Sequence, residues 1–249
     1  MKVFSVTGLT ATGKTTTIEQ IIKELKERGY SVGTVKEIHY DAFRIDTPGK
    51  NTYRHREAGA DTVTARAHHE TDIMYKGHMP IYDILKRYSE DYIILEGVRD
   101  AIVPEIALCK EDEQPELMPL TFAVSGVYAN NHCGTYLGLP VINAQTDIKA
   151  LVDLIIKKVP PLFYDIDPAC CSKCGYDCRG LLAAILRGEK SYSDCVLSSN
   201  IVSLKINGKD IVMVPFVQNL LNNVILGVVS ELNGYEKDGQ IDITIKNNE

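Results

Sequence analysis

The sequence lacks four features that would each point to a particular class of protein. No apolar run approaches the roughly 18–20 residues that cross a bilayer, so no membrane-spanning helix is expected. Acidic residues outnumber basic ones by 33 to 27, and the net charge of -6 argues against a general nucleic-acid or membrane-surface binder. Internal repeats and low-complexity tracts are absent. The chain begins without a secretory signal, and we therefore expect a cytoplasmic protein with reduced thiols.

The length and composition are those of an ordinary globular protein. The 249 residues, 45% hydrophobic and 24% charged, suffice for a core that needs no disulfides. A break at residues 157–161, Lys-Lys-Val-Pro-Pro, is a plausible boundary. We expect a nucleotide-binding domain over residues 1–160, a cysteine-bearing segment over 161–200 and a small α+β module over 201–249.

Hydrophobic periodicity indicates the fold of the first part. Residues 2–7 predict a strand, and Ile18, Ile21, Ile22 and Leu25 recur at i, i+3, i+4 and i+7 on one face of a helix that ends near Gly29. Further strands are expected at 31–38, 61–67, 71–76, 91–95 and 120–124, and helices at 52–60, 81–90 and 147–158. Strands that alternate with helices predict an α/β domain, similar to P-loop NTPases, with a mainly parallel sheet and flanking helices.

The last fifty residues have a different pattern. An Asn207-Gly208 turn between two short apolar runs, 202–206 and 210–213, predicts a hairpin. A helix is expected from Pro215 to about Leu232, followed by a closing strand over 241–245.

The strongest motif is Gly8-x-x-x-x-Gly13-Lys14-Thr15, which matches the P-loop pattern between a predicted strand and a predicted helix. Glycines let the backbone amides turn towards phosphate oxygens, and the helix N-terminus adds positive potential. Lys14 would reach the β and γ phosphates and Thr15 would ligate Mg²⁺. The expected nucleotide contacts are Gly8, Thr10, Ala11, Thr12, Gly13, Lys14, Thr15 and Thr16. A chance glycine-rich turn is the alternative, and the motif does not choose between GTP and ATP.

A P-loop protein also needs a carboxylate that holds Mg²⁺ or its water at the end of a neighbouring strand. Glu96 ends the apolar run Ile93-Ile-Leu and is followed by Gly97, which makes it the candidate, with Lys14 as its catalytic companion. A solvated acid at the sheet edge is the alternative. Asp46 is a second possible metal-binding or water-positioning acid.

A basic segment lies between these motifs. Lys50, Arg54 and Arg56, together with His55, are suited to a second anionic ligand or a phosphate tail. The alternative is a solvated helix face.

Five of the seven cysteines fall within 26 positions. The pattern Cys171-x2-Cys174-x3-Cys178-x16-Cys195, with Cys170 as an alternate ligand, supplies four thiolates. Three close cysteines and one distant cysteine favour a [4Fe-4S] cluster, with Zn²⁺ or a thiol redox centre as alternatives. Cys109 and Cys133 stand apart and are expected to be packing residues.

Residues 1–160 resemble the molybdopterin-guanine dinucleotide biosynthesis B family. The likeness rests on the P-loop, on the run from Phe43 to Ala60 that contains Arg-Ile-Asp46 and Tyr53-Arg-His-Arg-Glu, and on Leu95-Glu-Gly97. The resemblance implies a P-loop fold, commonly dimeric, that binds GTP with Mg²⁺ and assists attachment of a guanine nucleotide to molybdopterin in molybdenum or tungsten enzyme maturation. Carried over, Gly13, Lys14 and Thr15 would bind phosphates and Mg²⁺ beside Glu96.

The chain departs from that family at three places. Glu37-Ile-His-Tyr40 stands where the family has a His-Asp-x-His-like run, Asn51 replaces an Asp, and Thr10-Ala-Thr12 replaces commoner Asn or Ser residues. Separately, residues 174–189 resemble the four-cysteine iron–sulfur domain of corrinoid iron–sulfur proteins and certain electron-transport subunits. That domain commonly places four residues between its second and third cysteines, whereas this chain has three.

These patterns lead to one functional hypothesis and two rivals. The hypothesis is a cytoplasmic, homodimeric maturation factor that binds Mg²⁺ with GTP or ATP, hydrolyses it weakly, and acts with molybdopterin and a partner protein of cofactor biosynthesis. The rivals are a nucleotide-switched adaptor for electron transfer or metal delivery, and a P-loop kinase for a small molecule. Nucleic acids and membranes are not expected partners.

Overall fold

The computed structural model describes residues 1–249 apart from 41, 164–171, 173, 196–201, 207–208, 212, 214, 238, 240 and 246–249. The chain divides into two compact units. The first comprises Met1–Asp165 and Cys178–Lys190, and the second comprises Ile166–Asp177 and Ser191–Glu249. The division into parts at residues 160 and 200 stays a prediction.

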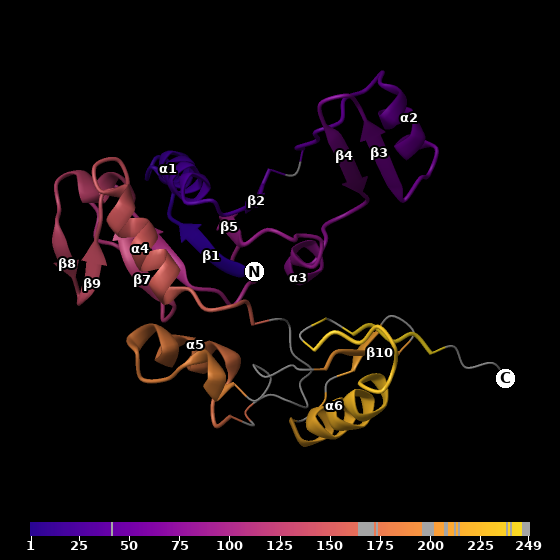
Figure 1. Cartoon of the computed structure of the whole chain (residues 1–249). Coiled ribbons are helices and arrows are strands. Elements are labelled where there is room, and N and C mark those ends of the chain that lie inside the picture. The colour runs from indigo at the N-terminus through magenta and orange to yellow at the C-terminus, as the bar shows by residue number, and fades with distance from the viewer. Residues whose placement is uncertain are drawn as a thin grey trace. The chain divides into compact units, whose positions relative to one another are not determined.

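The first unit is built on a seven-stranded sheet in the order β2-β5-β1-β6-β7-β9-β8 (Figure 1). All neighbouring pairs are parallel except β8 with β9, which are antiparallel at one edge. Its strands are β1 (Lys2–Thr7), β2 (Val32–Lys36), β5 (Tyr92–Glu96), β6 (Glu105–Leu108), β7 (Thr121–Ser125), β8 (Gly134–Tyr136) and β9 (Leu139–Val141). The expected α/β fold with a mainly parallel sheet and flanking helices is confirmed.

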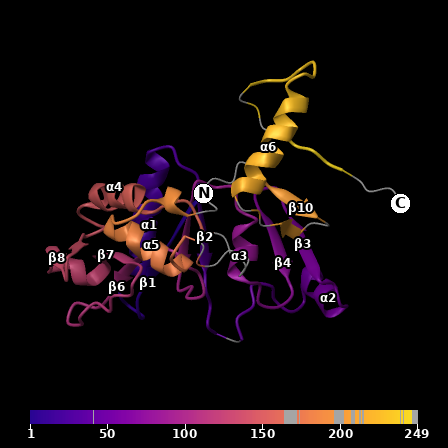
Figure 2. The ribbon, with the colours of Figure 1, turned by 90° about the horizontal axis from the view of Figure 1, so that it is seen from below.

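Helices cover both faces of this sheet (Figure 2). Its helical segments are α1 (Lys14–Glu27), α3 (Ile81–Leu85), the 3₁₀ helix η1 (Gly126–Asn130), α4 (Ile148–Lys158) and α5 (Cys178–Arg187). On one face α1 packs beside α4, and Arg28 ties them by donating to Glu24 and to Asp153 at 2.7 and 2.5 Å. On the other face Val3 packs with Ile81, Leu85 and Leu162 in a buried cluster.

Strand alternation explains why one sheet serves two helical layers. Because successive side chains point to opposite faces, Val3, Ser5 and Thr7 of β1 face one way, and Phe4 and Val6 face the other. Phe4 and Val6 are fully buried, as are Ile93, Ile94 and Leu95 of the neighbouring β5. Near-continuous burial of this kind is typical of parallel strands with helices on both sides.

The strands predicted at 61–67 and 71–76 are confirmed as β3 (Thr62–Arg66) and β4 (Thr71–Tyr75). They pair antiparallel in a separate hairpin and do not join the main sheet. The helix α2 (Asn51–Glu57) precedes this hairpin. The sequence prediction also missed β6, β8 and β9, because each has only three or four residues and too short a run to show a period.

The second unit contains the hairpin β10 (Leu204–Ile206) and β11 (Lys209–Ile211), the 3₁₀ helix η3 (Tyr192–Asp194) and the helix α6 (Pro215–Val229). The antiparallel pairing of β10 with β11 confirms the predicted hairpin, whose turn residues 207–208 lie outside the described residues. The strand expected over 241–245 is wrong, since those residues form no regular element. None of the helices in the described part of the chain combines the length and hydropathy needed to span a bilayer.

Candidate functional site

The phosphate loop links the end of β1 to the start of α1 through residues with unusual backbone conformations. Gly8, Ala11 and Gly13 have φ angles of 149°, 63° and 86°, and Gly13 is the N-cap of α1. A Cβ atom on Gly8 would lie 2.3 Å from the Leu108 carbonyl oxygen, so no larger residue fits there. The motif glycines are therefore required by the fold of the loop, and the loop leaves the first N–H groups of α1 available to an anion.

Two interactions hold the loop in shape. The buried Thr12 side chain donates from Oγ1 to the Leu9 carbonyl at 2.9 Å, and the Val127 N–H donates to the Thr12 carbonyl at 3.1 Å. Val127 belongs to η1, directly after β7. The sequence does not indicate η1 as part of the site; its one signal is the glycine at position 126, close after the strand expected at 120–124. The structure explains that glycine, because a Cβ on it would lie 2.3 Å from the Thr12 carbonyl oxygen.

Lys14 folds back over the loop. Its Nζ donates to the carbonyls of Gly8, at 2.8 Å, and Leu9. Burial lowers the pKa of Lys14, Glu96 opposes that shift, and the nearby Lys36 adds to it. An ammonium group bonded to loop carbonyls can exchange them for phosphate oxygens, which are stronger acceptors.

Glu96, the acid predicted to hold Mg²⁺, acts electrostatically on Lys14 of the loop. It ends β5 next to β1, paired in register with Val6, and its carboxylate influences the Lys14 ammonium. Lys36 on β2 reaches the same carboxylate at 3.2 Å, a partner that sequence reasoning missed. The Thr15 side chain is exposed at the start of α1. Thr15 and Glu96 thus offer a hydroxyl and a carboxylate oxygen, which are the ligand types that Mg²⁺ prefers.

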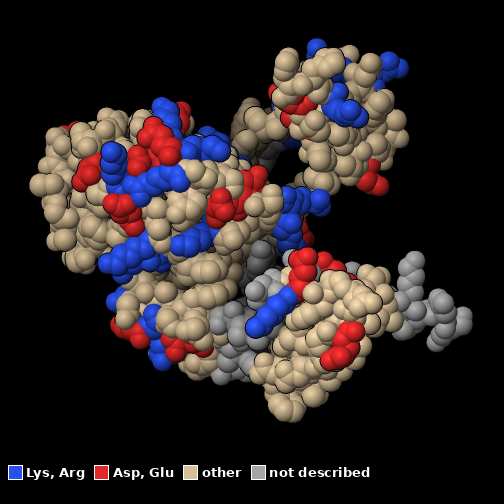
Figure 3. Space-filling model, in the orientation of Figure 1, with Lys and Arg blue, Asp and Glu red and all other residues tan. Residues whose placement is uncertain are grey.

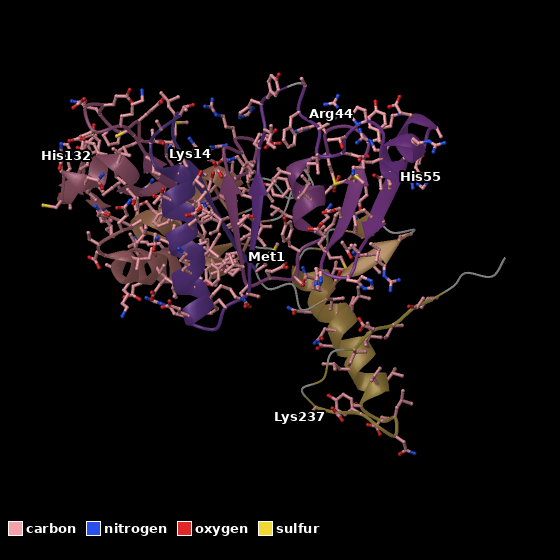
Figure 4. All side chains as sticks on the ribbon, turned by 90° about the horizontal axis from the view of Figure 1, so that it is seen from above. Met1, Lys14, Arg44, His55, His132 and Lys237 are labelled. Carbon is pink, nitrogen blue, oxygen red and sulfur yellow. The ribbon has the colours of Figure 1, made fainter. Side chains whose placement is uncertain are left out.

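The basic segment lies elsewhere in the first unit. Arg54, His55 and Arg56 are on α2, and Lys50 is its N-cap. Figure 4 shows His55 on α2 and Arg44 nearby, away from Lys14 at the start of α1. Asp46, which the sequence offered as a possible metal ligand, is buried beside α2, where it accepts from Thr52 Oγ1 at 3.0 Å and lies 3.9 Å from Arg56. The structure therefore does not bring this acid to the phosphate loop.

The cysteines give a partial result. Cys178 begins α5, Cys195 is buried, and Cys174 is partly buried. Cys170 and Cys171 lie outside the described residues. Within the part of the chain that is described, no three His, Cys, Asp or Glu side chains gather closely enough to hold a metal ion. Cys109 is buried and burial raises the pKa of its thiol, as expected of a packing residue. The packing role predicted for Cys133 is wrong, since that residue is exposed.

Comparison with known proteins identifies a family for the first half of the chain. Residues 3–127, just over half of the chain, match a family described as molybdopterin guanine dinucleotide synthesis protein B. A Methanocaldococcus jannaschii protein, provisionally named a molybdopterin-guanine dinucleotide biosynthesis adapter protein, is 27% identical over 98% of this chain and 97% of its own. The adapter protein of that name from Escherichia coli is 27% identical over 59% of this chain and 86% of its own.

One solved structure adds support for the fold. The crystal structure of Bacillus subtilis MobB superimposes with a TM-score of 0.51 and 22% sequence identity, covering 65% of this chain and 99% of its own. The α/β fold of the first unit is thus shared with that protein. The remaining third of this chain has no counterpart in it but lies within the match to the Methanocaldococcus jannaschii protein.

Proposed function

The chain belongs to the molybdopterin guanine dinucleotide synthesis protein B family, and on that premise we propose that it is a nucleotide-binding adapter in maturation of the molybdenum or tungsten cofactor. The observation that carries the proposal is the phosphate loop, with left-handed Gly8, Ala11 and Gly13 around the start of α1 and Lys14 held against the loop carbonyls. This arrangement suits a nucleoside triphosphate with Mg²⁺. The names of the relatives favour GTP over ATP.

Each loop residue has a defined task in this proposal. The backbone of residues 8–13 and the N-terminus of α1 surround the phosphates, Lys14 neutralises their charge, and Thr15 and Glu96 hold Mg²⁺ directly or through water. Mg²⁺ would draw negative charge from the phosphate oxygens. Thr10, Thr12 and Thr16 complete the loop, in which the buried Thr12 has a structural task.

Hydrolysis is slow in this proposal. The acid that ends a strand beside Lys14 is Glu96, and Asp46 is instead buried beside α2. A partner protein would therefore complete the site, in keeping with the word adapter in the names of the relatives. Lys50, Arg54 and Arg56 on and beside α2 would contact that partner or a second anion, and the protein would act as a cytoplasmic homodimer.

Nucleotide titration with matched variants tests the proposal. We expect the full-length protein to bind GTP·Mg²⁺ and to lose at least about 100-fold in affinity on Lys14→Ala, because a charge-assisted contact to phosphate is removed. Lys23→Ala, an exposed lysine on the same helix, should leave binding unchanged. Failure of the wild-type protein to bind any nucleoside triphosphate would refute the proposal.

The products of turnover separate the proposal from its rivals. Slow release of phosphate, stimulated by molybdopterin or a partner protein, supports the maturation role. Transfer of the phosphoryl group to a small molecule would instead identify a kinase. Tight nucleotide binding without any stimulated turnover would identify a switch-type adaptor for electron transfer or metal delivery.

For the cysteine segment we propose a [4Fe-4S] cluster on Cys171, Cys174, Cys178 and Cys195, with Cys170 as an alternate ligand and Zn²⁺ as the alternative metal. The support for this cluster is the spacing of the cysteines in the sequence. The described residues, which exclude Cys170 and Cys171, do not form a metal site by themselves. Anaerobic purification with iron, sulfide and zinc analysis tests it. We expect about four irons per chain in wild type and none in Cys174→Ala, with Cys133→Ala as a control. A colourless protein with one zinc would refute the cluster.

A further inference from the structure

A cavity of about 370 Å³ lies beside the phosphate loop, on the opposite sheet face from α1. It shares Gly8 and Leu9 with the loop and runs from there along β1 and β6 to the residues that precede β6 and β7, with the segments after β5 and β6 and the start of α5 completing its wall. Cavities of this size are typical of small-molecule sites, and one end of this cavity lies at the carboxyl ends of β1 and β6, where α/β proteins commonly bind ligands. No role assigned so far uses this cavity.

The inner wall of the cavity carries a carboxylate. The register between β1 and β6 pairs Ser5 with Glu105 and Thr7 with Ala107, so these four side chains share the face that lines the cavity. Glu105 accepts a hydrogen bond from the Thr121 hydroxyl at 2.6 Å, and the Met118 backbone also bonds to it. A carboxylate has about four lone-pair positions, so Glu105 keeps two for parallel hydrogen bonds from a ligand.

The rest of the cavity wall consists of an apolar part and two arginines. Val98, Val103, Leu108 and Leu120 supply flat apolar contacts, as expected around an aromatic ring. Arg99 follows β5, and Arg179 lies in the first turn of α5; both side chains are exposed. Arg179 acts electrostatically on Glu105. Guanidinium groups at the edge of a pocket favour an anionic substituent on whatever enters it.

These features select a ligand class. An inner carboxylate matches a heterocycle with adjacent N–H and NH₂ donors, which is the edge that an aminopyrimidinone presents. Apolar walls match the ring faces, and two arginines match an anionic tail. We propose that the cavity binds a pterin-type ring carrying an anionic group, with Glu105 accepting from its donor edge and Arg179 contacting its anion. The inference rests on the proposed function and gives it a place for the second substrate.

Arg179 lies outside the part of the chain that the family model matches. The helix α5 lies beyond residues 3–127, where the family match ends, yet it packs in the same compact unit as the phosphate loop. Lys158 of α4 donates to the Leu186 carbonyl of α5, which fixes the two helices to each other. The extension thus adds a cation to a cavity that the family domain forms on its other sides.

Fluorescence titration of the full-length protein with pterin-6-carboxylate tests the inference, with GTP·Mg²⁺ titrated in parallel. We expect saturable one-to-one binding that persists at saturating GTP and is weakened about tenfold or more by Glu105→Gln and Arg179→Ala, the loss of one charge-assisted contact each. Arg179→Ala should not weaken binding of unsubstituted pterin. Arg187→Ala, on the same helix but outside the cavity, is the matched control.

Ala107→Met provides a second variant that keeps every charge and fills the cavity. It should abolish pterin binding and leave GTP binding intact. The inference is overturned if GTP binds but pterin does not, if Arg179→Ala and Arg187→Ala behave alike, or if GTP displaces pterin so that the cavity holds the nucleotide base. Pterin binding without any nucleotide binding would support this inference and contradict the nucleotide proposal alone.

Discussion

At the residue scale, opposing effects act on the pKa of the Glu105 carboxyl group. Burial raises its pKa, while the hydrogen bond from Thr121 and the charge of Arg179 oppose that shift. Because the folded-state pKa lies above the value in the unfolded chain, the folded protein binds the proton more tightly. Protonation therefore contributes stability that is fully present below the unfolded-state pKa and is lost as pH rises through the folded-state pKa.

We predict that Glu105→Gln stabilises the folded protein to an extent that depends on pH, because glutamine resembles the protonated acid and keeps an acceptor for the Thr121 hydroxyl. We expect the variant to be more stable than wild type by on the order of 1 kcal/mol at pH 7–8, with the difference vanishing below about pH 4. Urea unfolding between pH 4 and 8 measures it. Glu19→Gln, at an exposed position of α1, is the control. A difference that does not change with pH would contradict the explanation.

At the element scale, η1 supports the phosphate loop by packing against it, although it contacts no phosphate in the proposed site. Gly126 has a φ of 75°, and a Cβ there would lie 2.3 Å from the Thr12 carbonyl oxygen, the acceptor of the Val127 N–H. A side chain at this position must push the two segments apart. The shape of the loop thus depends on a glycine more than a hundred residues away.

We therefore predict that Gly126→Ala lowers nucleotide affinity by about tenfold or more, because a displaced loop loses amide contacts of about 1.4 kcal/mol in total. Isothermal titration with GTP·Mg²⁺ measures it. Gly138→Ala is the matched control, since Gly138 has a φ of 85° and nothing within 4 Å of its added Cβ. Both variants place a side chain at a similar positive φ. Equal loss of nucleotide affinity in both would show that η1 does not support the phosphate loop.

The sequence was sufficient for the elements that depend on local pattern and insufficient for those that depend on pairing. The strand before Gly8 and the helix after Gly13 could be predicted from motif and periodicity. The position of Glu96 at the end of a strand could be predicted from the apolar run that precedes it. The contact of Gly126 with Thr12 and the pairing of Ser5 with Glu105 join residues distant in sequence. No local signal specifies such pairs, because tertiary contacts decide them.

At the scale of the whole molecule, charge is distributed in keeping with a net value of -6. Figure 3 shows acidic and basic side chains interspersed over the visible face of the first unit, without a uniformly basic surface among the described residues there. Anion recognition must therefore come from local geometry, as at the phosphate loop and at the two arginines of the cavity. The two proposed sites share Gly8 and Leu9.

Nucleotide binding should consequently stabilise one part of the chain selectively. Every described contact of the phosphate loop, including those with β6 and η1, lies within the first compact unit. In hydrogen exchange at a GTP·Mg²⁺ concentration 100 times Kd, we expect amides of residues 8–17 and 126–130 to gain up to about 100-fold protection, the factor that binding only to the native state allows. Amides of residues 204–229, in the second unit, should be unchanged. Lys14→Ala should remove the effect, and equal protection of both units would show that the nucleotide also stabilises the second.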